Sequence, residues 1–171
     1  MSVKDELDVK NRLVSILHGL ILVFFAGYEF YFKPGSCGDD NTSFEQRLMT
    51  ISVGYFIYDF LCMAYYGLLD MTMIIHHLIC IVGMSMSICF EHSANSIVNA
   101  MFIAEVSNPA MHLRTILKLY RLTYTKAYEL MEISFMLLYI YGRLLVGPSI
   151  TWSTCRCASN HIILKICAIA L

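Results

Sequence analysis

The chain has 171 residues, of which 58% are hydrophobic and 15% are charged, and its mean hydropathy is +0.63. Soluble domains carry about 25% charged residues, so this composition excludes an ordinary soluble domain and indicates a multi-pass membrane protein with one all-α helical bundle. The formal net charge of −1 gives no indication of nucleic-acid binding.

The N-terminal part predicts a short tail followed by a membrane span. Residues 1–12 are expected to form a cytoplasmic tail, and residues 13–171 a single transmembrane domain. The first apolar run, Leu13–Phe32, contains His18. It is long enough to cross about 30 Å of hydrocarbon and too long for the apolar core of a cleaved signal peptide. The polar segment that follows carries Asn41, the acceptor of a candidate glycosylation sequon.

Two further apolar runs are each interrupted by ionisable residues. The second predicted span, Leu48–Leu69, contains Asp59, and the third, Met71–Phe90, contains the adjacent His76 and His77. Asp, Lys or Arg at the centre of a membrane helix costs about 2.5–3.5 kcal/mol. Ionisable residues inside membranes therefore commonly mark functional sites, and we take these three as candidates.

The fourth predicted span, Ala94–Met111, carries one acid, Glu105. Near its end lies Asn108, followed by a proline, where we expect the helix to kink or break. The basic segment 114–126 comes next and contains no acid. It begins with Arg114, another candidate for the polar lining of a lipid pocket.

The last part of the chain predicts a fifth span and an incomplete sixth. The fifth is Ala127–Leu145, in which Arg143 is expected to extend toward the membrane surface. The final apolar run, residues 161–171, is too short to cross the bilayer at about 1.5 Å per residue. The sequence thus predicts at least five spans and a truncated C-terminal end.

Orientation follows from the positive-inside rule. The basic segment 114–126 is expected in the cytoplasm, which places the N-terminus there and the segment 33–47 in the lumen. Cys37, Cys155 and Cys157 lie in expected loops and would be open to oxidation if those loops face the lumen.

The candidate residues fall at similar depths. Counted from the cytoplasmic face at about 1.5 Å per residue, His18, both histidines of the pair and Glu105 lie roughly 8–9 Å deep, and Asp59 about 15 Å deep. A histidine with a carboxylate partner suits general-base catalysis. The alternative is that these groups only fasten helices to one another. Adjacent histidines on a helix point about 100° apart and cannot easily chelate one ion, so no metal or other cofactor is expected.

Several of these segments together resemble the TLC-domain family, which includes ceramide synthases and translocating-chain-associated membrane proteins. The matching segments are Asn11–His18, Tyr55–Asp59, Ile75–His77, Ala104–Pro109 and Leu113–Arg114. The resemblance implies a helical bundle around a lipid-accessible cavity, usually in endoplasmic reticulum membranes, with plasma membrane or Golgi as alternatives. It also implies a role in lipid metabolism or membrane lipid homeostasis.

In ceramide synthases the paired histidines lie in the catalytic site for N-acylation, and those positions match His76 and His77. By this resemblance the partners would be membrane lipids, with acyl-CoA or a sphingoid base as substrates of an acyltransferase. The synthases also carry an aspartate pair after the histidines, whereas Glu91 and Glu105 are the only acids between Leu78 and Val106. We therefore expect no ceramide synthesis. A non-catalytic lipid-binding or scaffold protein remains the other alternative.

Overall fold

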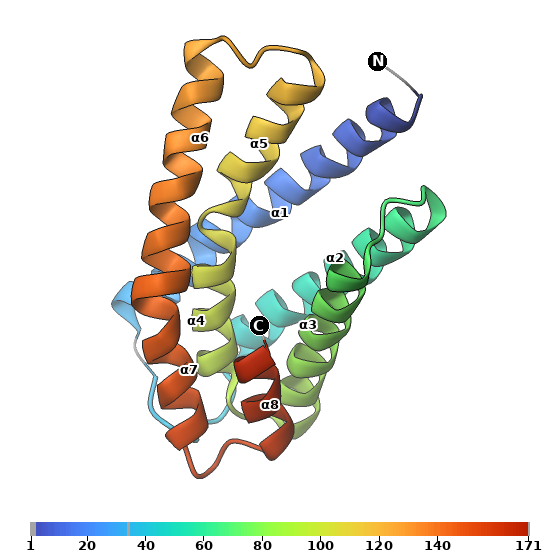
Figure 1. Ribbon diagram of the computed structural model, residues 1–171. Helices are drawn as coiled ribbons and strands as arrows, with labels where there is room; N and C mark the ends of the chain where they lie inside the picture. Colours follow the sequence, from blue (N-terminus) through green and yellow to red (C-terminus); the bar gives the residue numbers. More distant parts are fainter. Residues whose placement is uncertain (1–2, 34, 171) are drawn as a thin grey trace.

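The computed structural model describes residues 3–33 and 35–170, and over these residues the protein is an all-α bundle (Figure 1), so the predicted fold class is confirmed. Residues 1, 2 and 171, which belong to the expected tail and to the last apolar run, lie outside the described residues. The described helices are α1 (Val3–Phe32), α2 (Ser43–Tyr65), α3 (Met71–Phe90), α4 (Ala94–Glu105), α5 (Asn108–Leu119), α6 (Lys126–Tyr139), the π-helix η1 (Ile140–Val146), α7 (Gly147–Arg156) and α8 (Ile162–Ala170).

The first helix begins well before the predicted span. Two acids in its first turn, Asp5 and Glu6, suit the positive end of the helix dipole. Lys10 Nζ lies 2.8 Å from Glu6 Oε1, one turn away, and adds a favourable surface pair. The expected tail and the first span are therefore one continuous helix over the described residues.

Side-chain caps start the next two helices. The Thr42 hydroxyl accepts from the Glu45 backbone N–H at 3.2 Å, and the Glu45 carboxylate accepts from the Thr42 N–H at 2.8 Å. This reciprocal pair is a capping box, which fixes the start of α2. Asp70 accepts from the Met73 N–H at 2.8 Å and caps α3, whose bounds agree with the predicted third span.

The predicted fourth span is broken into two helices of 12 residues each, α4 and α5. Pro109 lies in the first turn of α5, where its missing N–H removes no helical hydrogen bond. The break expected at Asn108 is thus confirmed. Among the described residues, four helices are long and apolar enough to cross a membrane: α1, α2, α3 and the continuous helix Lys126–Arg156.

The prediction that the fifth helical segment stops at Leu145 is wrong, because the helix continues through η1 and α7 to Arg156. Pro148 has no N–H to donate to a carbonyl four residues earlier, and its ring would crowd that carbonyl. The π-helix relieves this conflict: the Gly147 N–H donates to the Gly142 carbonyl, five residues back. The wider turn lets the chain pass the proline without leaving the helix.

Three connections meet at one end of the bundle, at the bottom of Figure 1. A disulfide between Cys37 and Cys157 joins the connection after α1 to the one after α7, whereas Cys155 is a free thiol. Ser93, after α3, donates to the Asn160 side chain at 2.6 Å. We call this the disulfide end, and the opposite end, with the start of α1 and the basic connection after α5, the basic end.

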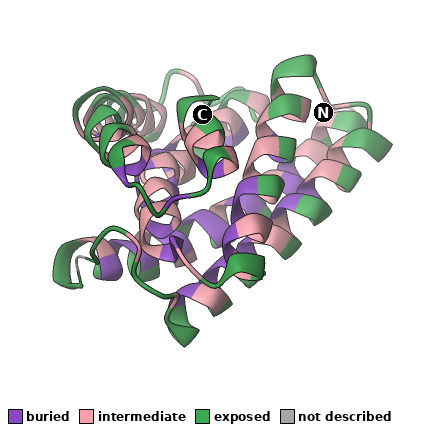
Figure 2. Ribbon diagram, turned by 90° about the horizontal axis from the view of Figure 1, so that it is seen from below, coloured by how far each residue is buried: buried purple, intermediate pink, exposed green. Residues whose placement is uncertain are grey.

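The core is narrow and the outer faces are apolar. Leu22, Met49 and Val98, from three helices, are completely buried where α1, α2 and α4 pack together. Large apolar side chains such as Leu137 and Leu144 are exposed on the outer side of the α6–α7 helix, and Figure 2 shows exposed residues along the outer faces of the bundle. Apolar outer faces around a partly polar interior are what a bilayer requires.

Candidate functional site

A buried polar seam, formed by Asn11, His18, Ser52, Asp59 and His77, runs between α1, α2 and α3. Asp59 is its centre. One carboxylate oxygen accepts from Asn11 Nδ2 at 2.7 Å, and the other lies 2.7 Å from His77 Nε2. Asp59, one of the candidate residues from the sequence, is therefore the partner of His77 on the neighbouring helix. Through its two contacts it holds α1, α2 and α3 together.

The hydrogen bonds of His77 constrain its protons. Its Nδ1 lies 2.8 Å from the Met73 carbonyl, which only accepts, so Nδ1 carries a hydrogen. Its Nε2 faces the carboxylate of Asp59. One further proton must lie between these two groups, as an imidazolium with a carboxylate or as an imidazole with a carboxylic acid. In both forms the pair has no net charge, which makes its burial tolerable.

His18 belongs to the same seam but has different contacts. Ser52 donates its hydroxyl hydrogen to the Leu48 carbonyl at 2.9 Å, so the Ser52 oxygen accepts from His18 Nε2 at 3.2 Å. The ring of His18 stacks on Tyr55, with centroids 3.8 Å apart. These contacts require a hydrogen on His18 Nε2 and fasten α1 to α2.

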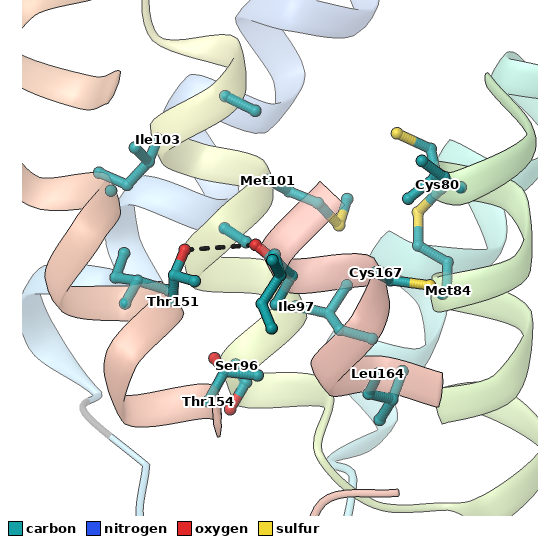
Figure 3. A pocket seen from close by; sticks show the side chains of 18 of the residues that line it. Cys80, Met84, Ser96, Ile97, Met101, Ile103, Thr151, Thr154, Leu164 and Cys167 are labelled. Atoms are coloured by element: carbon teal, nitrogen blue, oxygen red, sulfur yellow. Dashed lines mark hydrogen bonds between the residues drawn. The ribbon is translucent and has the colours of Figure 1, made fainter. Parts of the chain in front are cut away.

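A cavity of about 600 Å³ lies beside the seam, between α3, α4, α7 and α8 (Figure 3). Its walls are mainly apolar, and Met84, Ile97 and Met101 are among the side chains that Figure 3 shows around it. On the side of α7 and α8, Thr151 donates to the Ala168 carbonyl at 3.4 Å and links these two helices. A volume of this size is typical of ligand sites.

The basic side of this cavity contains its ionisable lining. His76 from α3, Glu105 from α4 and Arg143 from η1 all line the wall. Arg143 is close enough to both other groups to interact with them electrostatically. Cys80, one turn after His76, also lines the wall, and its Sγ lies 3.8 Å from His76 Nε2. We call His76, Glu105 and Arg143 the polar end of the cavity.

The two adjacent histidines therefore have different surroundings. His76 lines the cavity, whereas His77 faces Asp59 in the polar seam. Their rings are nearly perpendicular, with centroids 5.7 Å apart, and Phe56 contacts both rings from α2. Of the three residues that were expected to share one polar pocket, His76 and Glu105 line the cavity, whereas His77 does not. The walls around them are mainly apolar rather than polar.

The other predicted lining residues are placed differently from one another. Asn108 starts α5 and interacts with Glu105, and it is not part of the cavity wall. Arg114 points elsewhere: its guanidinium lies 3.6 Å from Glu132 and 5.3 Å from the ring of Phe135. Its contacts join α5 to α6, and it is not part of the cavity wall.

Asn41, the candidate glycosylation acceptor, lies at the disulfide end and is half-buried. Its Nδ2 donates to the Ser87 carbonyl at 2.8 Å, and its Oδ1 accepts from the Ala94 N–H at 2.8 Å. The side chain thus completes the end of α3 and the start of α4. Both functional groups of the amide are engaged in the folded protein.

Sequence reasoning missed Arg143 as a lining residue. Near the expected end of a span, an arginine is normally read as extending to the membrane surface. The available signal was the adjacent pattern of Gly142, Gly147 and Pro148, since a proline inside a helix commonly requires an irregular turn. That turn directs Arg143 into the cavity.

The fold and the cavity together define an all-α, multi-pass membrane protein with an internal cavity that has mainly apolar walls and includes His76, Glu105 and Arg143 in its lining. The TLC domain matches residues 8–169, so the chain belongs to the TLC-domain family. Proteins of this family are generally linked to lipid metabolism. No solved structure matches the chain.

Proposed function

We propose that this TLC-domain protein holds the hydrocarbon chain of a membrane lipid in its cavity and acts in membrane lipid metabolism or homeostasis. One observation carries the proposal: a mainly apolar cavity of about 600 Å³ in which the His, Glu and Arg side chains among the described lining residues lie together at one end. The lining follows α4 from Ser96 to Glu105, a rise of about 14 Å at 1.5 Å per residue. This length is close to half of the roughly 30 Å hydrocarbon core, the depth of one leaflet.

We further propose an orientation in the membrane, an organelle and a family relative for this protein. We place the basic end in the cytoplasm because of the Lys/Arg bias, and the disulfide end in the lumen, because disulfides persist in oxidising compartments. The endoplasmic reticulum membrane suits both. By the order and spacing of its motifs, the chain resembles TLC domain-containing protein 5 most among the small members of the family.

An acyltransferase is the second candidate, and the presence of His76 and Glu105 on the wall of the same cavity favours it. A histidine at this position can take a proton from an attacking amine or hydroxyl group of a lipid. Acyl-CoA would be the donor. The arrangement of His77 and Asp59 adds no catalytic group to the cavity, because both are turned into the seam.

Photo-cross-linking of the purified protein tests the lipid-binding proposal. A long-chain alcohol carrying a diazirine should label α3, α4, α7 or α8 in peptide mass spectrometry, and excess unlabelled alcohol should prevent the labelling. Ala100→Phe, which fills the cavity wall, should reduce labelling strongly. Leu137→Phe on the exposed face of α6 is the matched control. Labelling that is equal in all three proteins would contradict the proposal.

Lipid analysis of cells separates the two candidates. Cells lacking the protein should show an altered lipid composition that the wild-type chain restores. For an acyltransferase, His76→Ala should bind the diazirine alcohol normally and fail to restore the composition, since loss of a general base costs about 10²–10⁴ in rate. If His76→Ala restores the lipid composition, the result supports lipid binding without catalysis by this residue.

A further inference from the structure

The π-helix η1 fixes Arg143 at the polar end of the cavity. A Cβ on the preceding residue, Gly142, would lie 2.6 Å from the Ile103 carbonyl oxygen, so η1 and α4 meet backbone to backbone at this point. Glu105 is two residues further along α4. The close approach leaves Arg143 little freedom to move away from the cavity, and its Nε atom is buried.

An arginine within a membrane segment is costly and generally faces a partner or a ligand path rather than lipid. Arg143 interacts electrostatically with both Glu105 and His76. Its guanidinium has five N–H donors, and even a bidentate contact with one carboxylate uses two of them. The same planar fork matches the geometry of carboxylate and phosphate oxygens, which is the chemistry that an oxyanion ligand brings.

The opposite end of the cavity is less suited to a charged group. There, Ser93 donates to Asn160 Oδ1 at 2.6 Å, and Asn160 Nδ2 donates to the Thr154 carbonyl at 2.9 Å. These polar lining atoms satisfy one another and include no cation. An anionic head group would therefore be stabilised beside Arg143, with the apolar chain directed toward the disulfide end.

The cavity volume indicates the size of the ligand. A methylene group occupies roughly the volume of a water molecule, about 30 Å³, so about 600 Å³ holds on the order of 20 such groups. This space is of the order that one long hydrocarbon chain requires.

We propose that Arg143 binds the oxyanion head group, a carboxylate or a phosphate, of a single-chain lipid whose chain occupies the cavity. This inference rests on the proposed function, since it requires that the cavity hold a lipid. The guanidinium fork determines the ligand class, since it gives two parallel hydrogen bonds to a carboxylate or a phosphate.

Competition against the diazirine alcohol tests the inference, because labelling by this neutral probe does not depend on Arg143. The competitors are oleate, an oleoyl lysophosphatidate, sphingosine and oleyl alcohol. On the wild-type protein, oleate or the lysophosphatidate should compete at lower concentration than oleyl alcohol and sphingosine. Stronger competition by oleate assigns the carboxylate, and stronger competition by the lysophosphatidate assigns the phosphate.

Arg143→Met keeps the length of the side chain and removes its charge. It should weaken competition by the oxyanion lipids about tenfold to a hundredfold, the effect of losing hydrogen bonds to a charged group, and leave oleyl alcohol unchanged. Arg143→Lys keeps the charge but not the fork and should give an intermediate loss. The control is Arg156→Met, which removes an exposed arginine that contacts Trp152 at the disulfide end of α7.

Equal competition by oxyanion lipids in wild type and Arg143→Met, with labelling retained, would overturn the inference and leave lipid binding intact. Absence of labelling in the wild type would overturn the proposed function itself. If Arg143→Met is not monodisperse, Arg143→Lys decides: an unchanged preference for oxyanion lipids in that variant also overturns the inference.

Discussion

Replacing Asp59 by alanine should destabilise the protein, because this carboxylate holds three helices together. It is buried and makes two hydrogen bonds of 2.7 Å, with Asn11 from α1 and His77 from α3. Alanine removes both acceptors and leaves two donor groups facing an apolar gap. The neutral proton-sharing arrangement with His77 is lost at the same time.

The size of the effect follows from hydrogen-bond energies measured in membranes. Interhelical hydrogen bonds in a bilayer protein contribute about 0.6 kcal/mol on average and at most about 1.7 kcal/mol. Two such bonds give about 1–3.5 kcal/mol. For a chain of this length, 1 kcal/mol shifts Tm by roughly 2–4 °C, so Asp59→Ala should lower Tm by about 2–14 °C.

Thermal unfolding in detergent, followed by the monodisperse fraction after heating, measures this shift. Asp59→Asn is the matched control, because its amide oxygen can accept from Asn11 while its NH₂ donates to a neutral His77; its Tm should stay within about 3 °C of wild type. His77→Ala should resemble Asp59→Ala, whereas His76→Ala, on the cavity wall, should be nearly neutral. An unchanged Tm for Asp59→Ala, or equal losses for the two histidines, would refute the reasoning.

Three other predictions concern the two ends and the π-helix. Cys37→Ser and Cys157→Ser should each abolish a reduction-dependent mobility shift on gels, and a shift that persists in either variant would contradict the disulfide. The wild-type protein should carry no glycan at Asn41, so glycosidase should not change its mass, and a glycosidase-sensitive wild-type band would refute this. Asn41→Gln should lower Tm by a few degrees, since about 1–3 kcal/mol is lost when buried partners are left unpaired. Gly142→Ala should cost about 1–3 kcal/mol through overpacking against the α4 backbone, whereas Gly54→Ala, where the added methyl meets nothing within 4 Å, should be neutral or slightly stabilising; equal Tm values for the two variants would contradict the close contact.

Much of the fold could be predicted because residues close to the helix ends determine where several helices of this chain begin or end. Asp70 caps α3, and Pro109 starts α5, so the third span and the break in the fourth follow from residue type and position. The continuation past Pro148 could not be predicted in the same way. Whether a proline ends a helix or is absorbed by a π-turn depends on tertiary contacts, here the approach of Gly142 to α4.

The candidate site could likewise be predicted only in part from the sequence. The depth of each ionisable group follows from counting residues, and this indicated His76, His77 and Glu105 together. The direction of each side chain depends on the rotation of its helix about the helix axis. The rotation of α3 is set by its packing on α2, where His77 contacts Asp59. Adjacent helical positions differ by about 100°, so fixing His77 in the seam leaves His76 to face the cavity.

A substitution at His77 changes helix packing first, so loss of function there does not identify a catalytic group. Only His76 lies with Glu105 and Arg143 on the wall of the cavity. A chemical role for the pair therefore has to be established at His76, with the stability of the His77 variant as the reference. A function that survives His76→Ala and fails only with His77→Ala would belong to the fold rather than to the cavity.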